Sequence, residues 1–245
     1  MPDDKTWLAD FEAEAARRKD RADPDWHRGS RLHPDVLRSI RRFQVGENGD
    51  GANLIAKAAA SGNPAYAATV RLFVDEERNH ARMLAMLLAA AGSGTLTGHW
   101  SDTVFVWLRR LLGLRLELMV LMIAEVVALR YYRALRDGTG DPLTTEAAAL
   151  ILADEERHVP FHTDRLRHEL RDVPLRGLVV RAWWVLLFGT VAVVIVDHGR
   201  ALRRLGLPWR DFARDVTALF GAVVRASCEA PRGPGGTGHA GRPGS

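Results

Sequence analysis

The stretches DEERNH, at residues 75–80, and DEERH, at residues 154–158, decide the fold of this 245-residue chain. Each contains a Glu-x-x-His motif, and a further Glu lies upstream of both motifs at the same distance. Residues three apart share one face of an α-helix, so each motif presents a carboxylate and an imidazole in one direction. The two repeats are Glu47, Glu77 and His80, and then Glu125, Glu155 and His158.

A helix-breaking sequence lies midway through each repeat: SGNP at residues 61–64 and DGTGDP at residues 137–142. Residues equidistant from the turn of an antiparallel helical hairpin lie at the same height. The sequence therefore predicts two helical hairpins, each of which brings its upstream Glu beside its Glu-x-x-His motif.

Apolar residues stand at helical offsets around all four Glu residues of the repeats, which predicts that their carboxylates point inward. An ionised carboxylate buried without a partner is prohibitively costly. Two divalent cations would neutralise the four carboxylates, and the two imidazoles would bind them as neutral ligands. This ligand set suits iron or manganese. The single cysteine, Cys228, lies far from the motifs, so a thiolate zinc site is not expected. The alternative is a metal-free bundle with surface charges.

With these motifs the chain resembles the ferritin-like di-iron carboxylate superfamily, over residues 34–170. The resemblance implies an all-α four-helix bundle with a long crossover, which binds two Fe ions or a mixed Fe/Mn pair. It implies that Glu77 and Glu155 bridge the metals, and that each metal also has one terminal Glu and one His. These terminal ligands would be Glu47 and His80 on one metal, and Glu125 and His158 on the other.

Four further features of the sequence concern the surroundings of the centre. Metal-bound imidazoles usually donate their second N–H to a carboxylate, and Asp154, ahead of Glu76, is the better candidate for this role. Both could instead be surface acids. His162, one turn beyond His158, is a seventh metal ligand, a catalytic proton donor or a core histidine. Asp50 would hold a water molecule. The glycines between residues 46 and 51 indicate either close helix packing or a substrate cavity.

We expect four segments: a polar segment at 1–33, the bundle at 34–170, C-terminal apolar helices at 171–230 and a disordered tail at 231–245. The polar segment has a candidate helix from Lys5 to Lys19. The other predicted helices span 34–60, 63–91, 102–112, 114–136, 142–170, 176–204 and 209–226. Helix 102–112 belongs to the crossover.

The apolar helix at 176–204 is read first as a buried fifth helix, and second as a membrane-surface attachment. No secretory signal is visible, so the cytoplasm is the expected location, with the membrane reached only through this helix. The net charge of +4 is spread over the chain, and no recognition motif accompanies it, so nucleic acid is not an expected partner.

The function that these features favour is an O₂-dependent oxidase or oxygenase. It would act on a small organic substrate, use an electron donor, and exist as a monomer or a small homo-oligomer. One alternative is a ferroxidase that handles iron. Another is a membrane-associated protein without catalysis.

Overall fold

The computed structural model describes residues 3–98 and 113–229, which contain helices and no strand. The helices are α1 (Asp4–Asp20), the short η1 (Trp26–Arg28), α2 (Pro34–Glu47), α3 (Ala52–Ala60), α4 (Pro64–Ala90), α6 (Leu114–Gly138), α7 (Pro142–Glu169), α8 (Arg176–Arg204) and α9 (Trp209–Cys228). The predicted all-α class is confirmed. The predicted helix at 102–112 and the predicted disordered tail at 231–245 lie outside the described residues.

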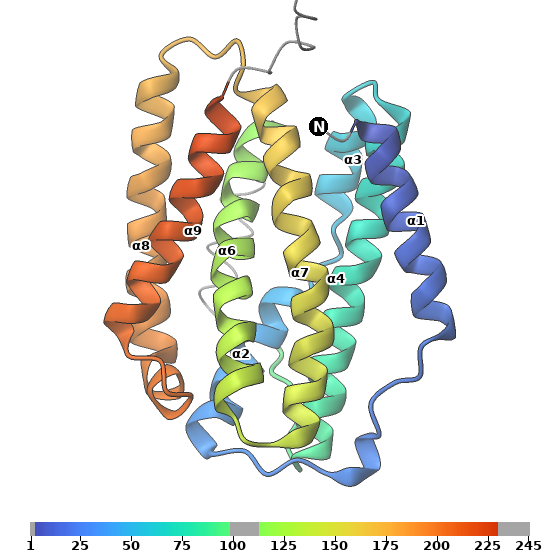
Figure 1. The fold of residues 1–245 in the computed structure, drawn as a ribbon, viewed down its shortest axis with the longest axis vertical. Coiled ribbons are helices and arrows are strands. Elements are labelled where there is room, and N and C mark those ends of the chain that lie inside the picture. Colours follow the sequence, from blue (N-terminus) through green and yellow to red (C-terminus); the bar gives the residue numbers. More distant parts are fainter. Residues whose placement is uncertain (1–2, 99–112, 230–245) are drawn as a thin grey trace, which may run out of the picture.

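The four-helix bundle consists of α2 continued by α3, then α4, α6 and α7 (Figure 1). Its two hairpins turn where the sequence predicts, at Gly62 and Gly140, both of which adopt a positive φ that favours glycine. Each turn leads into a capped helix. Asn63 accepts a hydrogen bond from the backbone N–H of Tyr66, and Asp141 accepts one from that of Thr144.

The prediction of one helix over residues 34–60 is wrong, because the chain leaves the helix after Glu47 and restarts at Ala52. Gly51 has a φ of 64°, and a Cβ atom there would lie 2.5 Å from the Val74 side chain. Helix α4 therefore approaches the break too closely for any larger residue at position 51. The interruption places a non-helical segment beside the last residue of α2.

Helix α1 packs against α4, although the sequence of residues 1–33 is mostly polar. Its Phe11 is fully buried and contacts Phe161 of α7, with ring centroids 5.1 Å apart. The predicted helix from Lys5 to Lys19 is thus present, and it adds a fifth helix to one side of the bundle.

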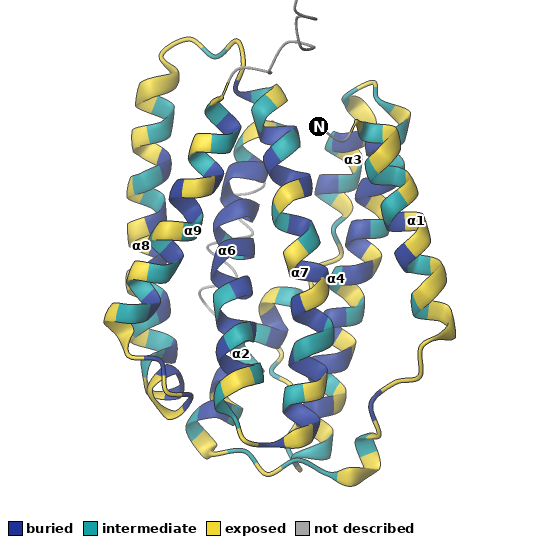
Figure 2. Cartoon of the chain, in the orientation of Figure 1, coloured by how far each residue is buried: buried dark blue, intermediate teal, exposed yellow. Residues whose placement is uncertain are grey.

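Helices α8 and α9 cover the opposite side of the bundle, where α8 contacts α2, α6 and α9 (Figure 1). The prediction of a buried helix at 176–204 is only partly right. By length and composition α8 could cross a membrane, and only 28% of its most apolar window is buried. Exposed residues follow the outer side of α8 along its length (Figure 2).

Gly138, at the end of α6, provides a test of how tightly α8 is held. A Cβ atom at this position would lie 2.1 Å from the carbonyl oxygen of Leu205, at the end of α8. We expect Gly138→Ala to lower the free energy of unfolding by about 1–3 kcal/mol, because backbone must move. Gly189→Ala is the control: it meets open space on α8, and alanine favours a helix by about 1 kcal/mol over glycine.

Urea denaturation measures both effects, read as a change of midpoint at constant slope. A Gly138→Ala protein as stable as the wild type would show that the α6–α8 contact is looser than described.

Candidate dimetal centre

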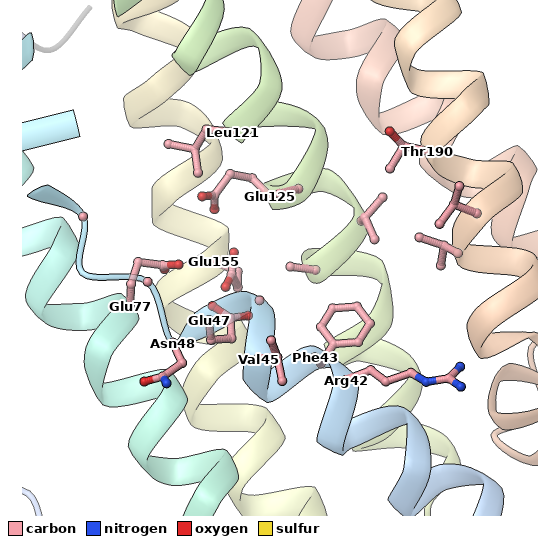
Figure 3. Close-up of a pocket in the computed structure, with 18 of the residues that line it drawn as sticks. Arg42, Phe43, Val45, Glu47, Asn48, Glu77, Leu121, Glu125, Glu155 and Thr190 are labelled. Atoms are coloured by element: carbon pink, nitrogen blue, oxygen red, sulfur yellow. The ribbon is translucent and has the colours of Figure 1, made fainter. Parts of the chain in front are cut away.

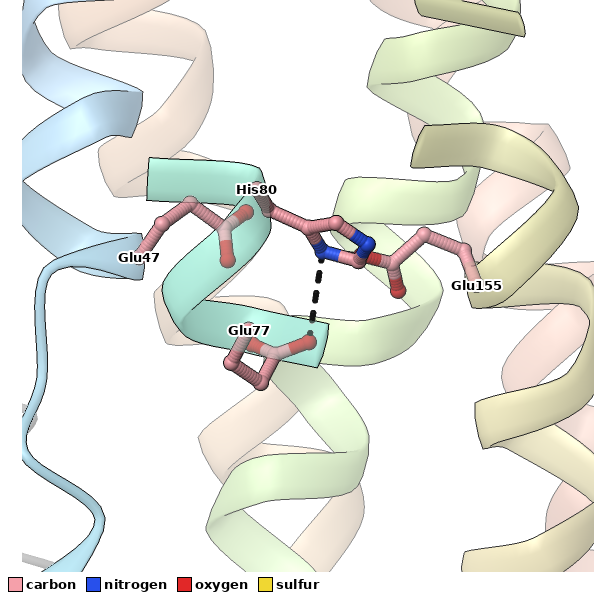
Figure 4. A group of neighbouring side chains, drawn as sticks. All are labelled: Glu47, Glu77, His80 and Glu155. Carbon is pink, nitrogen blue, oxygen red and sulfur yellow. Dashed lines mark ion pairs between the residues drawn. The ribbon is translucent and has the colours of Figure 1, made fainter. Parts of the chain in front are cut away.

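The bundle brings the six residues of the two repeats together at mid-height, and they form two overlapping groups. In each group, one ligand atom from every residue lies within 4.8 Å of those of the others. The first group is Glu47, Glu77, His80 and Glu155, shown in Figure 4, and the second is Glu77, Glu125 and His158. Glu77 belongs to both groups, which is the position expected of a bridging carboxylate.

The distances distinguish shared carboxylates from terminal ones. Glu77 Oε1 lies 3.4 Å from His80 Nδ1 and 3.3 Å from His158 Nδ1. Glu155 also faces both imidazoles, at 3.5 Å from His80 Nδ1 and 3.8 Å from His158 Nδ1. Glu125 lies 3.5 Å from His158 Nδ1. This geometry supports Glu77 and Glu155 as bridges and Glu125 as a terminal ligand, an assignment that stays a prediction.

A second layer of carboxylates orients the two imidazoles. His80 Nε2 donates to Asp154 at 3.0 Å, and His158 Nε2 donates to Glu76 at 2.8 Å. Both carboxylates are buried, so neither is a surface acid, and Glu76 is as well placed as Asp154. Each bond crosses between α4 and α7 and fixes the tautomer that leaves Nδ1 free to bind a metal.

Two arginines balance this second layer. Arg18 of α1 lies 2.9 Å from Glu76 and 3.1 Å from Asp154. Arg157 of α7 also pairs with both carboxylates. A buried carboxylate that is paired and hydrogen-bonded can stay ionised. Glu76, Asp154 and the two guanidinium groups balance one another in charge, and the same arginines also lie within 3.9 Å of the buried Glu14 of α1.

Among the inner carboxylates, the pKa values of Glu47 and Glu155 are raised, which favours the protonated form. Burial, reinforced by Glu77, raises the pKa of Glu47 to about 8, and burial next to other carboxylates raises that of Glu155. Burial would lower the pKa of His158, but the surrounding carboxylates outweigh it and raise the pKa to about 9. By contrast, burial would raise the pKa of Asp154, but the hydrogen bond from His80 and the charges of His80, Arg18 and His158 together outweigh it and lower the pKa. These raised pKa values mean that, without metal, Glu47, Glu155 and the two imidazoles hold protons more tightly than they would in water.

The residues present fit a pair of metal ions. Five buried polar atoms of the centre make no hydrogen bond within the described part of the chain: Glu77 Oε1, His80 Nδ1, Glu125 Oε2, Glu155 Oε2 and His158 Nδ1. Unsatisfied buried polar groups are rare and call for an explanation. All five are carboxylate or imidazole atoms that face one another, and two divalent cations between them would satisfy the whole set.

His162 and Asp50 lie outside both ligand groups. His162 is fully buried and stands edge-on to Phe73, with ring centroids 4.6 Å apart. These surroundings favour the core-histidine alternative, and a catalytic role stays a prediction. Asp50 is exposed, and its side chain accepts a hydrogen bond from the backbone N–H of Ala52 at the start of α3. Its role as a water holder also stays a prediction.

Sequence reasoning missed two polar side chains of the site besides Arg157. The Tyr132 hydroxyl donates to Glu47 Oε1 at 2.7 Å. Tyr132 lies two helical turns after Glu125, so the helical repeat of α6 could have found it. The sequence offers no comparable signal for Arg18, because nothing in the polar N-terminal segment indicates which helix this segment packs against.

A cavity of about 550 Å³ adjoins the four inner carboxylates and extends between α2, α6 and α8 (Figure 3). Apolar side chains line its far end, among them Phe43, Ala128 and Val194. The glycine-rich segment shows close packing at one position and lines the cavity at another. Gly51 packs closely against α4, whereas Gly49 lies in the cavity wall and a Cβ atom on it would have nothing within 4 Å. That a substrate occupies this cavity stays a prediction.

The second-layer hydrogen bond to His158 can be tested on Glu76. We expect Glu76→Gln to weaken metal binding by about 10- to 100-fold, since losing such a partner typically has that effect. Asp75→Asn is the matched control, because Asp75 is the adjacent acid on α4 and is exposed. Titration with Mn(II), followed by electron paramagnetic resonance, measures both. Equal affinity in the two variants would contradict the orienting role of Glu76.

The raised pKa values predict how pH affects the metal-free protein. Glu47, raised from 4.5 to about 8, and His158, raised from 6.5 to about 9, both bind protons more tightly in the folded state. The free energy of unfolding should therefore fall as the pH rises from about 5 to about 9. Metal-loaded protein should lack this loss, since cations replace the protons.

Urea denaturation of chelator-treated and Mn(II)-loaded protein at about pH 6 and about pH 9 compares the two states. A metal-free protein that is equally stable at both pH values, or more stable at the higher one, would contradict the proton-filled centre.

No family model matches the chain, and no curated protein sequence matches it. Among solved structures it is similar to R2-like ligand-binding oxidase with an aerobically reconstituted metal cofactor after photoconversion, with a TM-score of 0.67 and 13% identity, over 90% of this chain and 92% of that chain. Variants of that oxidase with Mn/Fe cofactors, one reconstituted anaerobically and one aerobically, match with a TM-score of 0.64 and 15% identity, over 90% of this chain and 93% of theirs. These oxidases belong to the ferritin-like di-iron carboxylate superfamily. The chain therefore has a ferritin-like fold, with α8 and α9 as its C-terminal helical extension.

Proposed function

We propose that this protein is a dimetal carboxylate oxidase that uses O₂ to oxidise an organic molecule bound in the cavity beside the centre. One observation carries the proposal: two carboxylates, Glu77 and Glu155, each face both imidazoles at the wall of a partly apolar cavity. Its support from outside the chain is the Mn/Fe cofactor of structurally similar oxidases.

The six residues of the two repeats would hold two Fe ions or one Mn and one Fe. When bound, these metals would supply the electrons that reduce O₂. An electron donor would restore the reduced metals after each turnover. The ligand set is rich in carboxylates, which suits both metals and offers no thiolate to select zinc.

The protein's own contribution is orientation, exclusion of water and control of protons. Asp154 and Glu76 hold the imidazoles with Nδ1 directed at the centre. Tyr132 donates to Glu47 and is buried, so it can hold the carboxylate in one position as the charge of the centre changes. The apolar side chains of the cavity would exclude water from a bound substrate.

The location that we propose is the cytoplasm. The expected oligomeric state is a monomer or a small homo-oligomer.

Metal content tests the ligand assignment. Protein loaded anaerobically with Fe(II) should bind close to two irons per chain. Glu77→Ala should lose both metals, because Glu77 belongs to both ligand groups. Glu125→Ala should lose mainly one metal, since Glu125 belongs to the second group alone. Glu156→Gln is the control, an exposed acid on the same helix as Glu155. Full loading of Glu77→Ala would contradict the assignment.

Oxygen uptake then separates the oxidase from the ferroxidase alternative. With Fe(II) and no reductant we expect one stoichiometric round of oxidation, and light scattering should show a monomer or a small oligomer. Mineralisation of many irons by a large hollow assembly would replace the oxidase with iron storage. Two bound metals without any O₂ consumption would contradict both the oxidase and the ferroxidase function.

A further inference from the structure

The outer side of α8 carries an unusual concentration of exposed hydrophobic side chains. Of the seven large ones exposed among the described residues, four lie on α8, Leu175 directly precedes the helix, and Trp209 is the first residue of α9 after the turn that follows α8. These six are Leu175, Leu178, Val185, Phe188, Val196 and Trp209. With the exposed Ala182, Gly189 and Ala192 between them, the helical ones recur every three or four residues and form one stripe. We call this set of residues the α8 surface.

Arginines lie among the end residues of the α8 surface. Arg181 is exposed near the start of the helix, and Arg200 and Arg203 near its end, on the same side as the stripe. Arg176 is exposed as well, but it stands on another side of the helix. None of the four has a carboxylate within salt-bridge distance in the described part of the chain. The sole acid of α8 is Asp197, which is paired with Arg42 on the inner side at 3.5 Å. The outer side is therefore apolar along its middle and positive at both ends.

This pattern of charge argues against a second copy of the chain as the partner. Two α8 surfaces packed in antiparallel fashion would place Arg181 beside Arg200 and Arg203 of the other copy. A parallel arrangement would place each arginine beside its own equivalent. Neither provides an acid, so the arginines would repel one another across the contact.

An anionic phospholipid surface complements both parts of the pattern. Its acyl boundary accepts apolar side chains, and its phosphates attract arginines near the headgroups. We propose that the α8 surface docks the protein on an anionic bilayer, with α8 lying in the plane of the interface. Trp209, at 51% exposed, would stand at the headgroup level, where tryptophan is enriched.

The inner side of α8 keeps the helix on the bundle and opposes a spanning arrangement. Its His198 is buried and shares a hydrogen bond of 2.7 Å with Ser39 of α2. Trp183 donates to the carbonyl oxygen of Met119 of α6 at 2.8 Å. Thr190 and Val194 on the same side line the cavity. Docking would place the cavity about one helix diameter, roughly 10 Å, from the acyl chains. The proposal itself does not depend on the oxidase function.

Flotation of the full-length protein with lipid vesicles tests this docking. We expect the protein to float with vesicles that contain phosphatidylglycerol in phosphatidylcholine, and to stay behind with pure phosphatidylcholine. Raising the salt concentration should weaken the binding, because exposed charges are screened. Equal flotation with both vesicle types, or with neither, would overturn the proposal.

Two double variants separate the apolar contribution from the charged one. Phe188→Ser with Val196→Ser, and Arg200→Gln with Arg203→Gln, should each weaken vesicle binding by about tenfold or more. Met86→Ser is the control for the first pair, as the one large exposed hydrophobic of the described residues outside the α8 surface. Arg28→Gln with Arg71→Gln, exposed arginines elsewhere, is the control for the second. All changes are at exposed positions, and circular dichroism verifies folding.

Sedimentation equilibrium tests whether a second copy of the chain is the partner of the α8 surface. A wild-type dimer that becomes a monomer in the Phe188→Ser, Val196→Ser protein would assign the α8 surface to self-association and overturn the lipid proposal. A monomeric wild type, or an oligomer that these substitutions leave intact, supports it.

Discussion

The gathering of four carboxylates between four helices is the constraint on which the structure depends. Glu125 and Glu155 are buried, the Glu77 side chain is only 20% exposed, and like charges so close together cannot all stay ionised. Two layers of side chains meet this electrostatic constraint. In the outer layer, two arginines neutralise the carboxylates that hold the imidazoles. In the inner layer, the four carboxylates carry up to four negative charges, which two divalent cations would neutralise. The proton-retaining state of the metal-free centre is the alternative solution to the same electrostatic problem.

Helix α1 belongs to this solution although its sequence is largely polar. Arg18 reaches both outer carboxylates, and Phe11 lies nearly parallel to the His158 ring, with centroids 6.1 Å apart. Removing Arg18 would leave two buried acids with Arg157 as their remaining arginine. The N-terminal segment is thus better described as a wall of the centre than as a separate polar extension, because a paired buried charge becomes costly when its partner is lost.

Much of this arrangement follows from sequence spacing. The two repeats and their turns predict the hairpins, since antiparallel helices of equal length must bring Glu47 to Glu77 and Glu125 to Glu155. The break after Glu47 has a signal in the sequence, since Asn48-Gly49 and Asp50-Gly51 are turn dipeptides. It was missed because residues 52–60 continue a helical pattern, and the contact that forbids a side chain at Gly51 comes from α4. The position of α1 was not predictable. It depends on where one phenylalanine and one arginine meet partners that are distant in sequence.

Helix α8 shows why hydropathy alone misjudges its role. Its apolar residues face two different surroundings, and a hydropathy average along the sequence does not separate them. The inner ones, such as Leu187 and Val194, pack on the bundle or line the cavity. The outer ones, such as Val185 and Val196, contact nothing comparable and remain exposed. Bundle helix α4 places charges on its outer side instead, as a helix facing water should. A helix that is apolar on its packed side and also on its free side is adapted to two different neighbours, and the protein interior accounts for only the first.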